Sequence, residues 1–537
     1  MPKVNLDALI ARENLDIRSK NKTGHGVRNP VISINELKFD NATFTSLRKP
    51  DFQRVTSEWD PEKVCGLIDS FIKADTIPAV ILWQSPSRYR FIIDGSHRLS
   101  ALAAWVNNDY GDGEKSKLFT DEISKTQLKF AEETRELVNS TIGEFKDYAD
   151  IKSKKHSNSS FALKARQLFQ IGVPVQYLEA DSGKSAENTF LKINREPVKI
   201  NDTELTLIEC RNKPNAIATR AIVNSGTGHE YWSKFSKVKK NTIKILSKQI
   251  NEMLFLPSLE NKTVKTLDLP IAGKLYSEQT LLLIFDLVNN INGVTIRKKK
   301  KGKGLNKKIE VLVNDIELKD DKRGNDTIKY LKKCKKIIKR INSKDPSSLG
   351  LHPAVYFYSS QGQHKPASFH SIVALIMDFE RNSWYRKFYD IREKFERFLI
   401  LNDDLVQQIG RKYRSAANGV SKIKGFYSLV LDIIGVEPAK KLKNKTIVAK
   451  IRENENYSYL RIAKVPDDTE AEDFDAARIS EAVISEKLRG EIKCKYCHGY
   501  MHTKSISGDH IVKKREGGKG KRGNLQLAHP YCNAINN

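Results

Sequence analysis

Two pairs of metal-ligand residues near the C-terminal end constrain the fold of this chain more than any other feature. Cys494 and Cys497 form a CxxC pair, and His529 and Cys532 form an HxxC pair that begins 32 residues after Cys497. Four such ligands are enough for a closed tetrahedral zinc site. A segment of about 45 residues cannot bury a sufficient core by itself, so we expect a structural zinc to hold it folded.

The six cysteines and the hydropathy indicate the compartment. Three cysteines lie in the last 44 residues and the other three are scattered, which fits a reducing compartment with a metal site better than a disulfide framework. No apolar run approaches the roughly 20 residues that span a bilayer. No secretory signal is visible at the N-terminus. We therefore expect a cytoplasmic protein with no membrane partner.

The chain is strongly basic, with 93 Lys and Arg against 65 Asp and Glu and a formal net charge of +28. A field of this sign concentrates polyanions, of which nucleic acid is the commonest. Solvated surface lysines would give the same composition, so both interpretations stay open. They also stay open for the two most basic segments, RKKKKGKGLNKK (297–308) and KYLKKCKKIIKRINSK (329–344). Each is either a solvated surface or a track for a phosphate backbone, and 297–308 is expected to be a cationic loop.

The length of 537 residues predicts more than one domain. Near the N-terminus, IPAVILW (77–83) and YRFIID (89–94) read as strands, and SHRLSALAAWV (96–106) has helical periodicity. We expect an α+β multidomain chain. Its regions would be an α/β domain (1–215), a mostly helical basic middle (216–465), an acidic linker with a short helix (466–490) and the metal module (491–537).

A second motif lies between the two ligand pairs, in the string GDHIVKKREGGKGKRGNLQL. Asp509 and His510 end a strand-like run, Asn524 follows a glycine-rich basic loop, and Asn533 comes nine residues later. This order resembles the HNH endonuclease family over residues 494–537, in a variant with Asn533 as the third letter. The resemblance implies a ββα-metal fold and makes His510 the general base. It makes Asn524 the residue that holds the loop and orients that base, and Asp509 and Asn533 the ligands of a divalent metal.

These residue types suit the hydrolysis of a phosphodiester bond in DNA. A neutral imidazole such as that of His510 can take a proton from water near pH 7. The oxygens of Asp509 and Asn533 are hard ligands that suit Mg²⁺ or Mn²⁺. Residues 487–537 carry eleven Lys and Arg against three acids, where a phosphate backbone would lie. The alternative is a zinc module that only grips DNA, with Asp509 and His510 as chance neighbours.

In the N-terminal half, the string Asp94-Gly95-Ser96-His97-Arg98 lies between a predicted strand and a predicted helix. A glycine at such a turn lets backbone N–H groups approach an anion, and the helix N-terminus adds positive potential. Arg98 supplies a fork for phosphate, and Asp94 is placed to hold a metal or water. The alternative is a structural turn in which Arg98 pairs with a core acid.

Together with short elements before and after it, this turn resembles the ParB/sulfiredoxin-like domain of GmrSD-type and SspE-type restriction proteins. The matching elements are Gln53, Arg54 and Trp59 before the turn, and Phe190, Ile193 and Asn194 after it. The resemblance implies a nucleotide- or phosphate-binding domain whose hydrolysis of a nucleoside triphosphate controls a separate nuclease. The residues that it assigns to the ligand are Gln53, Arg54, Asp94, Gly95, His97, Arg98 and Asn194. Ser96 and His97 replace two more usual glutamines, so binding is better supported than hydrolysis.

Three functions are compatible with these motifs. The leading hypothesis is a metal-dependent DNA endonuclease gated by a nucleotide-binding domain, in bacterial restriction or antiphage defence, a role that rests on the resemblance alone. The second is a nucleotide-switched, ParB-like DNA-binding protein with a non-catalytic zinc module. The third is a nuclease without nucleotide dependence. The expected cofactors are structural Zn²⁺, catalytic Mg²⁺ or Mn²⁺ and a nucleoside triphosphate. The expected partners are DNA and nucleotide, and homo-oligomer formation is left open.

Overall fold

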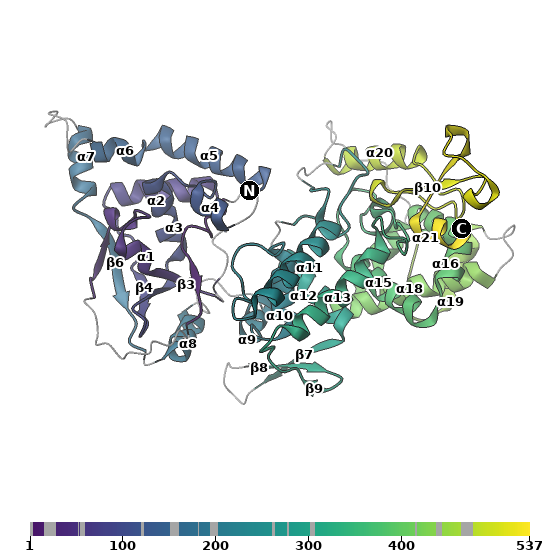
Figure 1. Cartoon of the computed structure of the whole chain (residues 1–537), viewed down its shortest axis with the longest axis horizontal. Coiled ribbons are helices and arrows are strands. Elements are labelled where there is room, and N and C mark those ends of the chain that lie inside the picture. Colours follow the sequence, from purple (N-terminus) through teal and green to yellow (C-terminus); the bar gives the residue numbers. More distant parts are fainter. Residues whose placement is uncertain are drawn as a thin grey trace. The chain divides into compact units, whose positions relative to one another are not determined.

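The computed structural model describes residues 4–15, 28–51, 53, 59–119, 123–150, 160–180, 182–193, 202–259, 264–275, 279–300, 307–413, 416–436, 443–462 and 476–537. The chain forms two compact units, which are described separately (Figure 1). The N-terminal unit comprises Met1–Arg211 with Thr227–Tyr231, and the C-terminal unit comprises Asn212–Gly226 with Trp232–Asn537. Within the described ranges, no helix has the length and hydropathy needed to cross a membrane.

A mixed six-stranded sheet forms the centre of the N-terminal unit, in the order β1-β3-β5-β4-β6-β2. Its strands are β1 (Arg12–Glu13), β2 (Val31–Ser33), β3 (Leu47–Pro50), β4 (Val80–Gln84), β5 (Arg90–Asp94) and β6 (Gly172–Tyr177). β1, β3 and β5 run parallel, and β4 is antiparallel to β5. The strands predicted at 77–83 and 89–94 are therefore confirmed as β4 and β5. The likeness of this sheet to ParB stays a prediction.

Helices cover both faces of this sheet because successive residues of its central strands point to opposite sides. On β5, Ile92 packs into the larger core with α2 (Pro61–Ile72) and α3 (Ser96–Asn107). Its neighbours Phe91 and Ile93 pack into a smaller core with Phe190 of α8 (Gly183–Ile193). The remaining helices of the unit are η1 (Ile34–Leu37), α1 (Ala42–Ser46), α4 (Glu114–Phe119), α5 (Lys125–Thr141), α6 (Phe145–Asp150), α7 (Ser160–Leu168) and α9 (Asp202–Glu209).

The C-terminal unit is mostly helical. Its longer helices are α10 (Pro214–Val223), α11 (Lys237–Phe255), α12 (Thr280–Asn292), α13 (Asn325–Ile341), α15 (Pro366–Asn382), α16 (Tyr385–Leu401), α17 (Asp403–Tyr413), α18 (Ala416–Val436), α19 (Asn444–Glu453) and α20 (Ala476–Arg489). The short helix α14 (Pro353–Tyr356) lies among them. The C-terminal metal module belongs to the same compact unit. The predicted domain boundaries at 215, 465 and 490 stay predictions.

One expectation for this unit is wrong. The segment 297–308, expected as a cationic loop, contributes to a three-stranded sheet of β7 (Val294–Lys300), β8 (Lys307–Val313) and β9 (Ile316–Glu317). β7 and β8 pair antiparallel over their full lengths, up to Lys300 opposite Lys307. The alternating β-branched residues of VTIRK and KIEVLV favour strands, and they outweigh the lysines. The tip, residues 301–306, lies outside the described residues.

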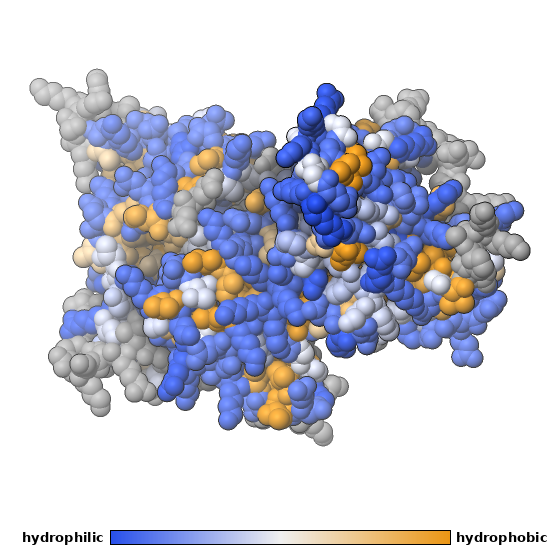
Figure 2. Space-filling model, turned by 45° about the vertical axis from the view of Figure 1, so that its right-hand side comes forward, coloured by the Kyte–Doolittle hydropathy of each residue, from blue (hydrophilic) through white to orange (hydrophobic). Residues whose placement is uncertain are grey.

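One face of the molecule is covered mostly by hydrophilic residues (Figure 2). Figure 2 shows one face on which hydrophobic residues appear only in small, separate groups. A partner that meets this face would therefore contact mostly hydrophilic side chains rather than one continuous apolar patch.

Candidate metal centre and active site

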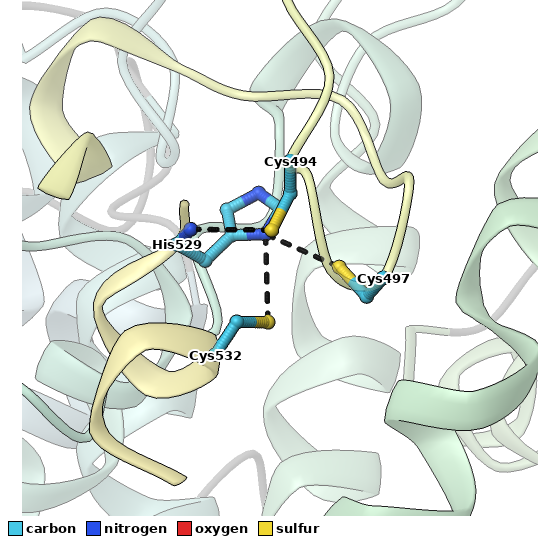
Figure 3. Close-up of side chains that lie close together, drawn as sticks. All are labelled: Cys494, Cys497, His529 and Cys532. Atoms are coloured by element: carbon cyan, nitrogen blue, oxygen red, sulfur yellow. Dashed lines mark hydrogen bonds between the residues drawn. The ribbon is translucent and has the colours of Figure 1, made fainter. Parts of the chain in front are cut away.

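Four side chains of the C-terminal module converge on one point (Figure 3). They are the predicted zinc ligands Cys494, Cys497, His529 and Cys532, all of which are buried. Their ligand atoms lie within 4.8 Å of one another. Because Zn–S and Zn–N bonds measure about 2.0–2.3 Å, the ligands of a tetrahedral zinc lie about 4 Å apart. The donor types, the burial and the spacing therefore fit a zinc ion after a small contraction.

Two local turns bring these ligands together. The backbone N–H of His498 donates to the carbonyl oxygen of Cys494 at 3.0 Å, which closes the turn that holds the CxxC pair. His529 is the N-cap of α21 (Pro530–Asn536), and a proline at N1 is well suited to begin a helix there. Cys532 follows within the first turn of α21, so both residues of the HxxC pair face the same point.

The His529 ring is oriented by the main chain. Its Nε2 lies 3.0 Å from the carbonyl oxygen of Tyr500, which can only accept a hydrogen bond. Nε2 therefore carries the proton, and Nδ1 faces the Sγ of Cys497 at 3.3 Å. Burial, and then the charge of Arg392, lower the pKa of His529. A neutral ring with an unprotonated Nδ1 is the form that binds a metal.

The two ligand pairs hold a hairpin followed by a helix. β10 (Ser507–His510) pairs antiparallel with β11 (Leu525–Ala528), which leads into α21. This ββα order confirms the arrangement predicted for the module. In the hairpin, Asp509 lies opposite Gln526, and His510 lies opposite Leu525.

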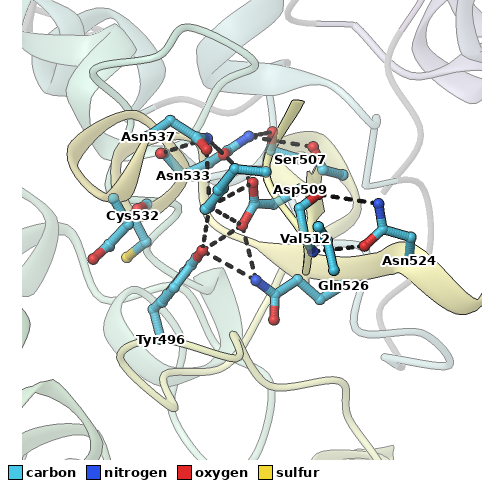
Figure 4. A network of polar contacts seen from close by, with 12 residues as sticks. Tyr496, Ser507, Asp509, Val512, Asn524, Gln526, Cys532, Asn533 and Asn537 are labelled. Atoms are coloured by element: carbon cyan, nitrogen blue, oxygen red, sulfur yellow. Dashed lines mark hydrogen bonds and ion pairs between the residues drawn. The ribbon is translucent and has the colours of Figure 1, made fainter. Parts of the chain in front are cut away.

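Asp509 is buried in a network of polar groups (Figure 4). Its carboxylate accepts hydrogen bonds from the Tyr496 hydroxyl, from Nε2 of Gln526 at 2.9 Å and from Nδ2 of Asn537 at 3.1 Å. Nζ of Lys513 lies 3.1 and 3.2 Å from its two oxygens. Burial raises the pKa of Asp509, but these hydrogen bonds outweigh it and hold that pKa well below its usual range. The carboxylate is therefore ionised at neutral pH.

His510 is the last residue of β10, so its side chain leaves the strand on the face opposite that of Asp509. The side chain is half-buried, and its ring makes no hydrogen bond to any residue that the structure describes. A histidine in this setting has both ring nitrogens available to a ligand or to water.

Asn524 closes the glycine-rich loop after His510. Its Oδ1 accepts from the backbone N–H of Val512 at 2.6 Å. Its Nδ2 donates to the carbonyl oxygens of Val512 at 3.1 Å and Lys519 at 2.9 Å. The loop also needs Gly518, because a Cβ there would lie 1.8 Å from the carbonyl oxygen of Val512. Asn524 therefore links Val512 to Lys519 across the loop, and its predicted role in orienting His510 stays a prediction.

Asn533 lies next to β10, on α21. Its Nδ2 donates to Oγ of Ser507 at 2.7 Å, and its Oδ1 accepts from Nδ2 of Asn537. The same Asn537 nitrogen also donates to Asp509, so one amide nitrogen bridges the side-chain oxygens of Asp509 and Asn533. The two residues predicted to hold a divalent cation therefore lie close together, and the oxygens of both accept hydrogen bonds from Asn537.

In the N-terminal unit, the turn between β5 and α3 forms the second candidate site. Gly95 has a φ of 96°, and a Cβ there would lie 2.5 Å from Cγ1 of Val80, so only glycine fits. Nη2 of Arg98 donates to Oδ2 of Asp94 at 2.7 Å. The Asp94 side chain is 40% exposed, so this pair is not one with a core acid. Nε of Arg98 is buried and has no acceptor among the described residues.

Two parts of the chain match known families. Residues 34–209 match the GmrSD restriction endonuclease, N-terminal domain, and residues 494–537 match the HNH endonuclease family. The chain joins a GmrSD-type N-terminal domain to an HNH endonuclease domain. Both matches are to endonuclease families, so the chain is a DNA-cleaving enzyme. No curated protein and no solved structure matches the chain.

The structure describes only some of the other residues that are assigned to the ligand of the GmrSD-type domain. Oε1 of Gln53 is buried and has no donor among the described residues. The His97 ring stacks on Trp59, with centroids 5.6 Å apart. Arg54 and Asn194 lie outside the described residues. The convergence of this set on one ligand stays a prediction.

A buried charge cluster beside Gln53 has no counterpart in the sequence analysis. The register of β1 and β3 sets Arg12 opposite Lys49, and the carboxylate of Asp7 bridges them. Asp7 accepts from Nη2 of Arg12 at 2.6 Å and from Nζ of Lys49 at 2.7 Å. Nη1 of Arg12 donates to the carbonyl oxygen of Gln53 at 2.6 Å. Burial lowers the pKa of Lys49 to about 8 despite this carboxylate. The cluster therefore fixes the backbone at Gln53, one of the residues that the resemblance assigns to the ligand.

The partners of Asp509 in the HNH domain were also missed. Tyr496 lies inside the CxxC pair, and Lys513 lies four residues after Asp509 in a run of basic residues that reads as solvent-exposed. Gln526 could have been found, because the hairpin register sets it directly opposite Asp509. The sequence signal for it is the strand-like run on each side of the glycine-rich loop, because two such runs predict an antiparallel hairpin.

Proposed function

We propose that this chain is a metal-dependent DNA endonuclease in which His510 of the HNH domain is the general base. The observation that carries the proposal is a half-buried His510 with no hydrogen-bond partner among the described residues, next to a buried and ionised Asp509. Both residues stand on a hairpin that the Cys3His cluster anchors. His510 would take a proton from the water that attacks the phosphate.

The other residues of the site have supporting roles in this proposal. Asn524 fixes the loop that follows His510 and so limits where the ring can point. Asp509 and Asn533 would hold Mg²⁺ or Mn²⁺, and such an ion would neutralise charge that develops on the phosphate. Cys494, Cys497, His529 and Cys532 would hold a structural zinc, which takes no part in the chemistry.

Exchange of His510 for Asn tests the assignment of the base. With Mg²⁺ or Mn²⁺ and supercoiled plasmid, we expect His510→Asn to lose about 100- to 10,000-fold in nicking rate, as is usual when a general base is removed. DNA affinity and zinc content should stay at wild-type values. His498→Asn is the matched control, because His498 is exposed and Asn tolerates its positive φ of 54°. Equal nicking by the two variants would exclude His510 as the base.

The same proposal assigns a nucleotide site to the GmrSD-type domain, at the turn from Asp94 to Arg98. Three features support it: the left-handed Gly95, the N-terminus of α3 behind it, and the buried Nε of Arg98, which has no acceptor in the part of the chain that the structure describes. Backbone N–H groups at such a turn and a guanidinium suit a phosphate group. Nucleotide binding here would gate the nuclease, in restriction or antiphage defence in the cytoplasm.

Phosphate release tests this second site. We expect wild-type protein to bind a nucleoside triphosphate, and Arg98→Met to weaken that binding at least tenfold, because it removes a charge-assisted hydrogen bond to phosphate. Isothermal titration with each of the four nucleotides, together with phosphate release, measures both steps. Lys117→Met is the control, since Lys117 is exposed on α4 of the same unit. If the wild-type protein binds none of the four nucleotides, the nucleotide site is excluded, and the third hypothesis, a nuclease without nucleotide dependence, is supported instead.

A further inference from the structure

A lysine-lined groove lies between α11 and α13 of the C-terminal unit, and none of its lining residues belongs to the HNH domain. It has a volume of about 510 Å³. We call it the lysine groove, and its lining residues are Lys239 of α11 and Asn325, Ile328, Lys329, Lys332, Lys333 and Lys336 of α13. Five of these seven residues are cations.

The sequence of α13 places these lysines on one face. Lys329, Lys332, Lys333 and Lys336 follow the spacing i, i+3, i+4, i+7, which repeats along one side of a helix. The opposite side, with residues such as Leu331 and Ile338, is buried in the helical core. Like charges at these spacings destabilise a helix. Solubility requires only scattered charges of either sign on an exposed helix face. A row of four lysines on one face repels itself and is therefore unfavourable in the free protein.

The charges of the groove are mostly uncompensated. Lys336 pairs with Glu380 at 2.5 Å. Lys239 and the other three lysines that line the groove form no ion pair with any described residue. At least four positive charges therefore face one hollow, where their mutual repulsion is relieved by a polyanion.

The groove is fixed relative to the nuclease site, because the two helices that form it end at the HNH domain. Beyond the end of α13, Nδ2 of Asn342 lies 2.9 Å from Nδ1 of His502. At the end of α11, Nζ of Lys504 donates to the carbonyl oxygen of Glu252 at 2.9 Å. Lys333 precedes Asn342 by nine residues, about 14 Å along a helix. A duplex held at the HNH domain extends well beyond that distance.

We propose that the lysine groove binds the sugar-phosphate backbone of the DNA that the HNH domain cuts, several base pairs from the cut. The residues that line the groove indicate the chemistry of the partner. It has no aromatic ring on which a base could stack and no guanidinium to read a base edge, so it suits phosphates without regard to sequence. It offers no apolar anchor of the kind that protein partners use. The inference rests on the proposed nuclease function for the identity of the polyanion.

The salt dependence of DNA binding tests the groove directly. The triple variant Lys329→Gln, Lys332→Gln, Lys333→Gln keeps good helix formers and removes three charges. Binding of a labelled duplex is followed by fluorescence anisotropy in EDTA, between 50 and 300 mM salt. We expect at least about tenfold weaker binding near 0.1 M salt. The slope of log K against log salt should fall in magnitude by about 0.9 for each phosphate that the groove no longer neutralises.

A control variant that loses the same number of positive charges separates the effect of the groove from the effect of the total charge of the protein. Lys117→Gln, Lys125→Gln, Lys164→Gln removes three exposed lysines from helices of the N-terminal unit and should keep the wild-type slope. His510→Asn should also keep it, so a failed nuclease assignment would leave this result intact. An unchanged slope in the groove variant, with its wild-type melting temperature, would overturn the proposal. Loss of binding to polyglutamate but not to the duplex would overturn it too, in favour of an acidic protein.

Discussion

Removing both cysteines of the CxxC pair, in Cys494→Ala with Cys497→Ala, is expected to unfold the HNH domain and to abolish DNA cleavage. The domain has almost no core apart from the metal ligands. Its hydrophobic cluster has five buried members, Cys494, Cys497, Met501, Ala528 and Cys532, and three of them are ligands. Structural zinc contributes about 10–16 kcal/mol of apparent binding free energy, which is folding free energy in such a domain. No packing within the domain can replace it.

The measurements are zinc content by metal analysis, limited proteolysis and nicking activity. The variant should lose about one zinc per chain and become susceptible to cleavage after residue 490, while the GmrSD-type domain stays resistant. Cys65→Ala with Cys334→Ala is the matched control. Both of its cysteines are buried, lie outside the cluster and should leave the zinc content unchanged. A cysteine-pair variant with full zinc content and wild-type nicking would refute the structural site.

The parts of this molecule that sequence alone predicts are those in which the chemistry is local. The zinc ligands come in two pairs spaced three residues apart, and Gly95 lies at a strand-to-helix turn with Arg98 one helical turn later. In each case one turn of backbone sets the relative position of the groups, so spacing carries the information. The prediction of a loop at 297–308 is wrong for the described residues 297–300 and 307–308, because the alternation that begins with Val294 and Ile296 favours a strand despite the lysines.

Contacts between distant segments could not be predicted, because they depend on how helices pack. Lys504 reads as one more basic residue of the module, yet it caps the end of α11, and burial lowers its pKa to about 8. His502 reads as a loop residue, yet its Nε2 lies 3.1 Å from Asp268, more than 200 positions earlier. Such residues decide where the HNH domain sits on the helical middle, and no local pattern marks them.

Arg392 and Glu396 of α16 are the clearest example of this class. Nε of Arg392 donates to Oε1 of Glu396 at 2.7 Å, and both side chains are at most 2% exposed. Nη1 of Arg392 lies 3.2 Å from Nδ1 of His529, and its Nη2 donates to the carbonyl oxygen of Gly350 at 3.0 Å. Glu396 accepts from the backbone N–H of Tyr500 at 2.7 Å. One buried ion pair thus joins the helical middle to both sides of the zinc cluster.

Arg392→Met is therefore expected to destabilise the C-terminal unit by about 3–5 kcal/mol, because it leaves the Glu396 carboxylate buried without its partner. Urea unfolding measures the loss, and the rate of zinc release to a chelator should rise with it. Arg386→Met is the matched control on the same helix. Arg386 also pairs with a residue four positions on, Asp390, at 3.5 Å, but both side chains are more than half exposed. Exposed pairs of this kind contribute less than about 1 kcal/mol.

A double variant separates the charge of Arg392 from its packing. Arg392→Met with Glu396→Gln removes the uncompensated carboxylate but keeps one oxygen, which can still accept from the backbone N–H of Tyr500 as Oε2 of Glu396 does. The amide nitrogen takes the place of Oε1 and can donate to the hydroxyl oxygen of Tyr356. If the unpaired charge causes the loss, the double variant should recover a large part of the stability and of the slow zinc release. If Arg392 acts by filling space alone, the double variant should be no more stable than the single one. Equal effects of Arg392→Met and Arg386→Met would show that α16 does not hold the HNH domain in place.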